Sequence, residues 1–357
     1  MKVQANSYIA QIENYVPGKA KIGGRKAIKL SSNENALGAS PMALEAYKSH
    51  SGELFRYADG SCTMLREGLA AKYKIDANRI VCGAGSDELI ALLTMSFASV
   101  GDEIIYSAHG FLMYPISAQK VGAVAIKAPE KNLKADIDSL ISAITPKTKM
   151  IFLANPNNPT GSYLTRAELE KFLNAVPKNI LVVLDCAYEE FAQALDYPGG
   201  IEFVNRFPNV VMTRTFSKIY GLASLRIGWS YSCAEIAETL NKVRGPFNVG
   251  GPAQVAAAAA LQDDEFLNAS KKHNQKWLEI FFAELGASSK IKAHPSIANF
   301  ILLDFLSADA GKKANELLLE NGIIFREMGS YGLPNTLRAT IGTDEENSQI
   351  LEILKKL

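Results

Sequence analysis

The chain has 357 residues and a mass of 38.7 kDa, with 48% hydrophobic and 21% charged residues. This composition excludes a disordered chain, and the length favours one large domain and one smaller domain. The formal net charge of +1 gives no electrostatic footprint for nucleic acid, so the expected partners are small molecules bound at a local site.

The cysteines and the start of the chain give expectations about location. The four cysteines form no Cys-x-x-Cys pair, which argues against a zinc site or a secreted disulfide framework. The first residues contain no apolar core bounded by a cleavage site, and polar residues break the apolar stretch after Glu88 well short of a membrane span. The histidines lack the spacing of metal ligands. We therefore expect a cytoplasmic protein without a metal ion or a membrane contact.

Residues 36–244 alternate short apolar runs rich in β-branched residues with longer helical runs. Residues 79–83 precede a helical run at 88–98, and residues 149–155 precede one at 166–176. This alternation is typical of βαβ units, so it predicts a large α/β domain whose mixed, mostly parallel sheet is flanked by helices. Ligands of such sheets bind at the carboxyl ends of the strands.

The first polar motif is Gly83-Ala84-Gly85-Ser86-Asp87-Glu88, between a predicted strand and a predicted helix. Its glycines allow a tight turn, and the N–H groups at the start of the helix can cradle an anion. A simple turn with Ser86 or Asp87 as the helix N-cap is an equally good interpretation. The motif lacks the Gly-Lys-Ser/Thr ending of a nucleoside-triphosphate loop.

Two further motifs lie at the ends of predicted strands. Asn155-Pro156-Asn157-Asn158-Pro159-Thr160-Gly161 can present an amide side chain rigidly, although a structural turn explains it equally well. Asp185 ends the apolar run 180–185, where a carboxylate is costly unless it pairs with a cationic ligand atom or caps a helix. Tyr188 lies near the same edge, and an ordinary core tyrosine is the competing interpretation.

The segment Thr215-Phe216-Ser217-Lys218, with Arg226 eight residues further on, places an amine, a hydroxyl and a guanidinium on one loop. A single loop lysine is usually a solvated charge. Here, however, an anion cradle, a rigid asparagine, a buried aspartate and this lysine follow one another at the ends of successive strands. A pyridoxal phosphate enzyme needs an amine for the aldehyde, an anion site for the phosphate and a carboxylate for the pyridinium nitrogen.

Residues 245–252 form a Gly/Pro cluster that marks a boundary or hinge. The chain beyond it mixes helical runs with apolar strands such as residues 298–305, as a smaller α+β domain would. We therefore expect an N-terminal arm of residues 1–35 packed with the small domain, a large domain of residues 36–244 and a small domain of residues 245–357.

Several segments carry a resemblance to a known family. They are YVPGK, KLSSNENALGASP, RYADG, GAGSDE, NPNNPTG, DCAYEEF, TFSKIYGLASLRIGW and LRATIGT. Through these segments, spread over nearly the whole length, the chain resembles the fold-type I aminotransferases that depend on pyridoxal phosphate and, among them, the histidinol-phosphate aminotransferase family. TFSK with its spaced arginine and NPTG are specific for the superfamily, whereas SSNEN and RYADG are more particular to the family.

The resemblance implies roles around the cofactor ring. Lys218 would form the Schiff base with pyridoxal phosphate and later move a proton between Cα and C4′. Asp185 would pair with the pyridinium nitrogen, and Asn158 and Tyr188 would contact O3′. Tyr114 matches the aromatic residue that stacks on the ring. The residues expected to act in catalysis are thus Lys218, Asp185 and Tyr188.

The resemblance also implies how other residues are used. The cofactor phosphate would be bound by main-chain groups around Ser86 and Asp87, together with Ser217 and Arg226. Tyr57 would reach the phosphate bound to the other subunit, which implies a homodimer. Arg326 and Arg338 would bind the phosphate of histidinol phosphate and a carboxylate of glutamate in turn, in a pocket that Tyr15 lines. By residue type alone, surface charge is the competing interpretation of Arg326.

Three positions depart from the family pattern, because Ala36, Cys186 and Ser224 stand where members usually have proline, glutamate and glycine. None is expected to touch a catalytic atom, but they leave the substrate open. The expected reaction, in histidine biosynthesis, converts L-histidinol phosphate and 2-oxoglutarate into imidazole acetol phosphate and L-glutamate. The alternatives are an aromatic amino acid transaminase, a decarboxylase of a phosphorylated amino acid and a non-catalytic protein that binds pyridoxal phosphate.

Overall fold

The computed structural model describes residues 3–13, 21–22, 27–286 and 288–357. Its main feature is a seven-stranded sheet in the order β2-β10-β9-β8-β7-β3-β4. β10 runs antiparallel to both of its neighbours, and the other neighbouring strands are parallel. The strands are β2 (Ile80–Gly83), β3 (Glu103–Ser107), β4 (Val124–Ala128), β7 (Thr148–Ala154), β8 (Leu181–Asp185), β9 (Val210–Thr215) and β10 (Gly228–Tyr231). The predicted mixed, mostly parallel sheet is confirmed.

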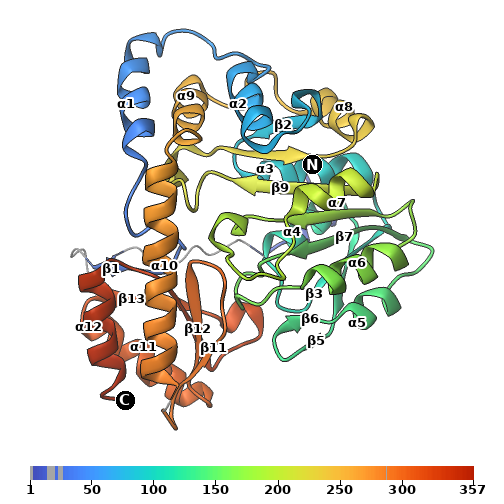
Figure 1. The fold of residues 1–357 in the computed structure, drawn as a ribbon. Helices are drawn as coiled ribbons and strands as arrows, with labels where there is room; N and C mark the ends of the chain where they lie inside the picture. Colours follow the sequence, from blue (N-terminus) through green and yellow to red (C-terminus); the bar gives the residue numbers. More distant parts are fainter. Residues whose placement is uncertain (1–2, 14–20, 23–26, 287) are drawn as a thin grey trace.

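Helices cover both faces of this sheet (Figure 1). Along β8, Val182 and Leu184 belong to one core, whereas Leu181 and Val183 belong to the other, because successive side chains of a strand point to opposite faces. One face packs against α3 (Ser86–Phe97), α4 (Met113–Lys120) and α8 (Ala234–Val243). The opposite face packs against α2 (Thr63–Tyr73), α5 (Ile137–Ser142), α6 (Arg166–Ala175), α7 (Gly200–Arg206) and α9 (Gly251–Ala260).

Local sequence explains where several of these helices begin. α1 (Pro41–Ser49) begins after Ser40, whose side chain accepts a hydrogen bond from the N–H of Ala43. α6 begins with a capping box in which Thr165 and Glu168 satisfy each other's backbone N–H groups. α9 follows the Gly/Pro cluster at residues 245–252 and packs against α1 and α2.

A second, smaller sheet has four antiparallel strands in the order β11-β12-β15-β14. Its strands are β11 (Lys292–His294), β12 (Phe300–Asp304), β14 (Arg326–Glu327) and β15 (Thr336–Thr340). The helices around it are α10 (Asp264–Leu285), α11 (Ala308–Glu320) and α12 (Asp344–Leu354). α10 is the long orange helix left of the centre of Figure 1, and it joins two cores because Leu267 packs in the large one and Trp277 in the small one.

Short elements complete the described chain. β1 (Ile28–Lys29) pairs in parallel with β13 (Ile323–Ile324), so these two residues are attached to the small sheet's side of the molecule. β5 (Glu130–Lys131) and β6 (Lys134–Ala135) form a hairpin. The 3-10 helices are Ile9–Gln11, His50–Glu53, Ala77–Arg79, Glu189–Phe191, Ala223–Leu225 and Gly329–Tyr331.

Candidate active site

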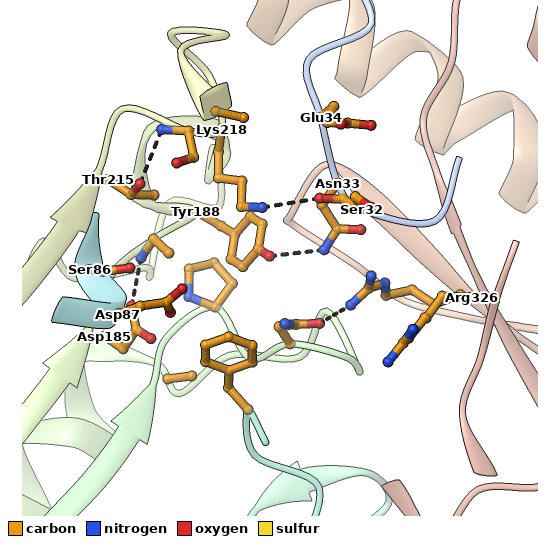
Figure 2. Close-up of a pocket in the computed structure, with 18 of the residues that line it drawn as sticks. Ser32, Asn33, Glu34, Ser86, Asp87, Asp185, Tyr188, Thr215, Lys218 and Arg326 are labelled. Atoms are coloured by element: carbon orange, nitrogen blue, oxygen red, sulfur yellow. Dashed lines mark hydrogen bonds between the residues drawn. The ribbon is translucent and has the colours of Figure 1, made fainter. Parts of the chain in front are cut away.

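The carboxyl ends of β7, β8 and β9 open into a cavity of about 280 Å³ (Figure 2). Such an edge is where a parallel sheet collects ligands, because the loops after the strands converge there. The small sheet closes the opposite side. The predicted residues that line this cavity are Ser86, Asp87, Tyr114, Asn158, Asp185, Tyr188, Ser217, Lys218, Arg226, Arg326 and Arg338.

Asp185, the last residue of β8, is only 5% exposed. Its Oδ2 accepts a hydrogen bond from the hydroxyl of Tyr114 over 2.8 Å, and its Oδ1 accepts one from the N–H of Ala187 over 3.3 Å. Burial raises the pKa of Asp185 to about 6, against the lowering effect of Tyr114. The alternative of a helix N-cap is wrong, because the next 3-10 helix begins at Glu189 and Tyr188 is its N-cap. A buried carboxylate of this kind is suited to a cationic ligand atom.

Two aromatic side chains border this end of the cavity. The ring of Tyr114 is 1% exposed and stacks on Phe152, with centroids 4.7 Å apart and an interplanar angle of 2°. Phe111 lines the cavity too and meets Tyr114 edge to face, with centroids 5.9 Å apart. Because one face of the Tyr114 ring is taken by Phe152, the half-buried Phe111 offers more free ring surface to a ligand. That Phe111 lines this cavity was not predicted from the sequence.

Two polar side chains face the cavity with one end held by other residues. Tyr188 Oη accepts a hydrogen bond from Nδ2 of Asn33 over 2.9 Å. Asn158 Oδ1 accepts one from Arg338, which also donates to the carbonyl oxygen of Ser31 over 2.8 Å. Burial raises the pKa of Tyr188, so its hydroxyl keeps its proton and can donate.

Lys218 lies on the loop that follows β9, and its side chain points into the cavity (Figure 2). Its Nζ donates to the carbonyl oxygen of Ser32 over 3.2 Å and lies 5.7 Å from the centroid of the Tyr188 ring. Burial, together with the nearby Arg338, lowers the pKa of Lys218 to about 8. The amine therefore loses its proton more easily than an exposed lysine, as a nucleophile or a general base requires.

An anion cradle forms where α3 begins. Gly85 is the N-cap of this helix, with a positive φ of 85° and no side-chain cap, so the alternative that Ser86 or Asp87 is the N-cap is wrong. A Cβ on Gly85 would lie 2.5 Å from Nη2 of Arg226, so glycine lets the guanidinium approach the backbone. Arg226 donates to Oγ of Ser217 over 3.2 Å. The helix N-terminus, the guanidinium and the hydroxyl fit a phosphate.

On the opposite side, Arg326 of β14 and Arg338 of β15 are directly paired in the register of the small sheet. Residues paired across antiparallel strands point to the same face, so both guanidinium groups reach the cavity. Arg338 is 5% exposed, whereas Arg326 is half-buried. Two cations at this end favour an anionic substrate group.

The other two predicted residues are not among the described residues that line this cavity. Tyr57 is 84% exposed and stacks on Phe247, with centroids 4.7 Å apart. Tyr15 lies outside the described residues. The three departures from the family pattern, Ala36, Cys186 and Ser224, do not line the cavity either.

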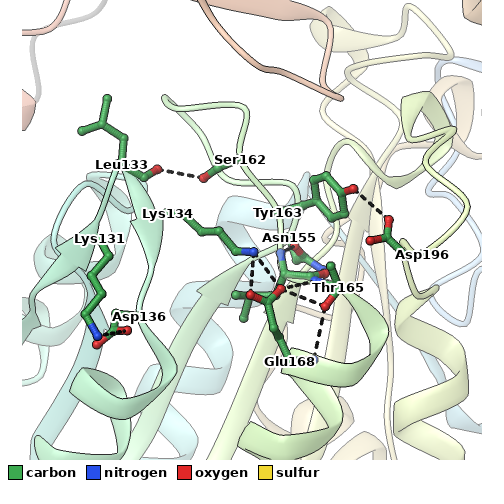
Figure 3. Close-up of polar contacts among 11 residues, drawn as sticks. Lys131, Leu133, Lys134, Asp136, Asn155, Ser162, Tyr163, Thr165, Glu168 and Asp196 are labelled. Atoms are coloured by element: carbon green, nitrogen blue, oxygen red, sulfur yellow. Dashed lines mark hydrogen bonds and ion pairs between the residues drawn. The ribbon is translucent and has the colours of Figure 1, made fainter.

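A second cavity of about 890 Å³ lies beside the loop at residues 160–163 (Figure 3). Each lysine in its described lining is paired with an acid, as in the bridge from Lys134 to Glu168 at 2.6 Å and the one from Lys131 to Asp136 at 2.9 Å. Among the described residues of its lining, no lysine is without an acidic partner, so none is readily available to an anionic substrate. The described residues also contain no cluster of possible metal ligands, and none of their helices is long and apolar enough to cross a membrane.

A buried ion cluster supports the loops of the site from the far face of β9, and it was not predicted from the sequence. The guanidinium of Arg214 lies 2.6 Å from Glu190 and 3.3 Å from Glu189, and it stacks over the rings of Tyr73 and Trp229. Arg214 adjoins Thr215, at the start of the lysine loop, and the two glutamates follow Tyr188. The cluster thus fixes the Tyr188 segment against the lysine loop.

Comparison with known proteins identifies the family. Residues 25–354 match the family described as aminotransferase class I and II, so the protein is a member of this class of aminotransferases. A histidinol-phosphate aminotransferase of Paramagnetospirillum magneticum is 49% identical over 352 residues, which cover 98% of this chain and 96% of that protein. One of Rhodospirillum rubrum is 48% identical over 355 residues, covering 97% and 94%. Within its class, the chain belongs to the histidinol-phosphate aminotransferases.

Solved structures agree with this assignment. The crystal structure of histidinol-phosphate aminotransferase from Sinorhizobium meliloti in complex with pyridoxal-5'-phosphate matches with a TM-score of 0.91 and 26% identity, over 100% of this chain and 99% of that one. An aspartate aminotransferase of Thermus thermophilus matches with a TM-score of 0.85 at 20% identity, which shows the shared fold alone. The resemblance inferred from the sequence and the expected fold-type I architecture are both confirmed.

Proposed function

We propose that this aminotransferase uses pyridoxal phosphate to convert L-histidinol phosphate and 2-oxoglutarate into imidazole acetol phosphate and L-glutamate, in histidine biosynthesis. The observation that carries the proposal is the order of groups across one cavity. An anion cradle and a buried aspartate lie on one side, Lys218 faces the space between, and two arginines lie opposite. The names of the relatives favour histidinol phosphate over an aromatic amino acid as the substrate.

The residues present fit the cofactor. When bound, pyridoxal phosphate supplies an aldehyde that condenses with amines and a ring that accepts the electrons of the carbanion at Cα. Main-chain groups around Ser86 and Asp87, together with Ser217 and Arg226, would hold its phosphate. Asp185 would pair with the pyridinium nitrogen, a cation that would satisfy a carboxylate otherwise costly to bury. Phe111 and Tyr114 border the ring.

Proton transfer falls to Lys218. Its lowered pKa leaves a larger share of the amine neutral than in an exposed lysine, and the neutral amine is the form that would bond to the cofactor aldehyde. With a substrate amine at the cofactor in its place, Lys218 would act as the general base at Cα of the substrate. Asn158 and Tyr188 would donate hydrogen bonds to O3′ of the cofactor, and Tyr188 is suited to this because burial keeps it protonated.

The arginine pair explains how one site takes two unlike substrates. Arg326 and Arg338 bind the phosphate of histidinol phosphate in one half-reaction and a carboxylate of glutamate in the other. A guanidinium group matches both anions, because its parallel N–H donors are spaced like two oxygens of a phosphate or of a carboxylate. Tyr15 lines this pocket in the same proposal.

The proposed assembly is a homodimer in which Tyr57 reaches the phosphate of the partner's cofactor. Large apolar side chains around Tyr57 support it, since Leu54, Phe55 and Met64 are each more than half exposed and Phe247 nearly half exposed. Mixing inactive Lys218→Ala subunits with weakened Tyr57→Ala subunits tests this. If Tyr57 acts across the interface, the hybrid dimer has one intact site and activity returns; if it acts within its own subunit, no activity returns.

In this proposal the protein acts in the cytoplasm, where its four free cysteines stay reduced. It is divided into an arm of residues 1–35, a large domain of residues 36–244 and a small domain of residues 245–357.

The test of the function has two parts. Borohydride reduction of the protein supplied with pyridoxal phosphate should add to the peptide that contains Lys218 the mass of the cofactor less one water and plus two hydrogens. The reduced protein should be inactive, and the untreated protein should release more than one imidazole acetol phosphate per site from histidinol phosphate only when 2-oxoglutarate regenerates the cofactor. Labelling at another lysine, or no labelling, would refute the assignment.

A further inference from the structure

The hydroxyl of Tyr188 belongs to a short chain of buried hydrogen bonds. Nδ2 of Asn33 donates to Oη of Tyr188 over 2.9 Å (Figure 2). Oδ1 of Asn33 accepts from the hydroxyl of Thr340 over 3.2 Å, and the backbone N–H of Asn33 donates to the same hydroxyl oxygen over 2.9 Å. Asn33, Tyr188 and Thr340 are all less than 5% exposed. Thr340 therefore lies at one end of the chain and Tyr188 at the other.

This chain has a direction. The oxygen of Thr340 accepts the backbone N–H of Asn33, so its own proton needs an acceptor, and Oδ1 of Asn33 supplies one. The oxygen end of the Asn33 amide is then turned to Thr340 and the NH₂ end to Tyr188. Tyr188 can only accept from that group, so its own proton points elsewhere. The side chain lines the cavity, where the cofactor's O3′ is expected.

The second residue expected at O3′ is arranged in the same way. Arg338 donates to Oδ1 of Asn158, so the donating end of that amide is the one not engaged by Arg338. Arg338 and Thr340 are both on β15, with side chains on the same face of that strand because they are two positions apart. One strand of the small sheet thus orients both donors.

The backbone conformation of Asn33 also indicates that its side chain is held in a fixed position. Its φ is 55°, in the left-handed region that asparagine tolerates better than other residues with a side chain. Nδ2 of Asn299 on the small-sheet side also donates to its carbonyl oxygen over 3.1 Å. The backbone N–H, the backbone carbonyl and both ends of the side-chain amide of Asn33 are thus all hydrogen-bonded. These contacts hold a strained backbone in place and leave the side chain little freedom.

We infer that Asn33 and Thr340 are positioning residues that aim the proton of Tyr188 at O3′ of the cofactor, so that β15 of the small sheet sets the strength of that hydrogen bond. The inference rests on the proposed binding of pyridoxal phosphate to Lys218. A donor to O3′ stabilises its negative charge, which would otherwise hold the proton on the nitrogen joined to Lys218. Losing the donor raises the pKa of that nitrogen by about one unit, since a hydrogen bond to a charged group has about this worth.

The test is a pH titration of the absorption band of the cofactor bound to Lys218. Thr340→Val removes the hydroxyl at nearly constant shape, and Thr340→Ser is the matched control that keeps it. We expect the titration midpoint of Thr340→Val to move upward by at least half of the shift in Tyr188→Phe, and that of Thr340→Ser to stay in place. In the double variant Thr340→Val/Tyr188→Phe, the shift should equal that of Tyr188→Phe alone.

Each other outcome is decisive. If Thr340 has only a structural role, Thr340→Val lowers the melting temperature without moving the titration midpoint, or it moves the midpoint equally with and without the Tyr188 hydroxyl. Either result overturns the inference. If Thr340→Val does not fold, Asn33→Asp serves, because a carboxylate only accepts and draws the Tyr188 proton to itself; comparison with Asn33→Asp/Tyr188→Phe cancels the effect of the added charge. If the unsubstituted protein shows no band joined to Lys218, the proposed function fails as well, whereas an unmoved midpoint with a normal band refutes only the inference.

Discussion

The hydroxyl of Tyr114 donates a hydrogen bond to Oδ2 of Asp185 over 2.8 Å, so the aspartate expected to pair with the pyridinium nitrogen already has one buried partner. The sequence suggested only that Tyr114 stacks on the ring. In the structure the same residue lowers the pKa of Asp185 against the stronger effect of burial. Tyr114 therefore helps to keep this carboxylate charged.

Tyr114→Phe should weaken cofactor binding by about tenfold, because the ring stays in place while a hydrogen bond to a charged group is lost. Dissociation constants for pyridoxal phosphate, measured on the apoprotein, would show this. Tyr163→Phe is a matched control, since its hydroxyl also donates to an aspartate, Asp196, outside the cavity lining (Figure 3). Equal affinities in both variants would contradict the role of the Tyr114 hydroxyl.

Asp185→Asn should separate binding from chemistry. The amide fits the same space and leaves most of the cofactor affinity, but it cannot balance a charged pyridinium nitrogen, so the ring becomes a poorer acceptor of electrons. We expect removal of the Cα proton to slow by ~1,000-fold in single turnover, an electrostatic loss of the size seen when one stabilising group is removed from an active site. A normal single-turnover rate would rule out the pyridinium contact.

The two arginines should differ in what they affect. Arg338→Lys keeps the charge but loses the bidentate fork and the contact to Asn158, so KM should rise for both histidinol phosphate and glutamate and the cofactor band should shift. Arg326→Lys should raise KM for both substrates with no change in the band. Steady-state kinetics with each substrate and absorption spectra measure this. If either variant weakened one substrate only, the idea of a shared anion site would be wrong.

Lys218 makes the stability of the apoprotein depend on pH. Its pKa in the folded protein is about 8, below its ordinary value of 10.5, so between these pH values the unfolded chain binds more protons and stability rises with pH. Below pH 8 the destabilisation is complete. Apoprotein with Lys218→Met should therefore be more stable at pH 7, by ~3 kcal/mol, and the difference should shrink toward pH 10. Urea unfolding at several pH values checks it; a gain independent of pH would point to packing instead.

The ion cluster under the site should matter for folding more than surface pairs do. Arg214→Met leaves Glu189 and Glu190 buried without their cation, which should lower the free energy of unfolding by about 3–5 kcal/mol. Arg206→Met is the control, because that arginine also pairs with two glutamates but at the exposed surface, and its unfolding midpoint should hardly move. Similar losses in both variants would show that burial of the Arg214 cluster carries no special weight.

The sheet and the main groups of the site were predictable because both follow local rules. A buried strand reads as an apolar run, and polar residues directly after such runs must converge at one edge of a parallel sheet. Asp185, Asn158 and Lys218 were found in this way, and the structure places all three around one cavity.

Other features depend on contacts that no local pattern encodes. Asn33 and Thr340 are 307 positions apart, and nothing at either position announces the pair. Arg214 sits in an apolar strand and is explained only by acids that fold back onto it. Whether Tyr114 or Phe111 offers its ring to a ligand depends on the stacking of Tyr114 on Phe152. The proposed role of the surface around Tyr57 depends on a second copy of the chain.

The most direct measurement of the central claim is the bleaching of the cofactor band in a single half-reaction, with L-histidinol phosphate and L-phenylalanine compared on the same purified protein. The account predicts that histidinol phosphate reacts with a kcat/KM at least ~100-fold higher, because only this substrate carries a phosphate for Arg326 and Arg338. Lys218→Ala should show no bleaching with either donor. Equal or faster reaction with phenylalanine, or bleaching without Lys218, would contradict the account.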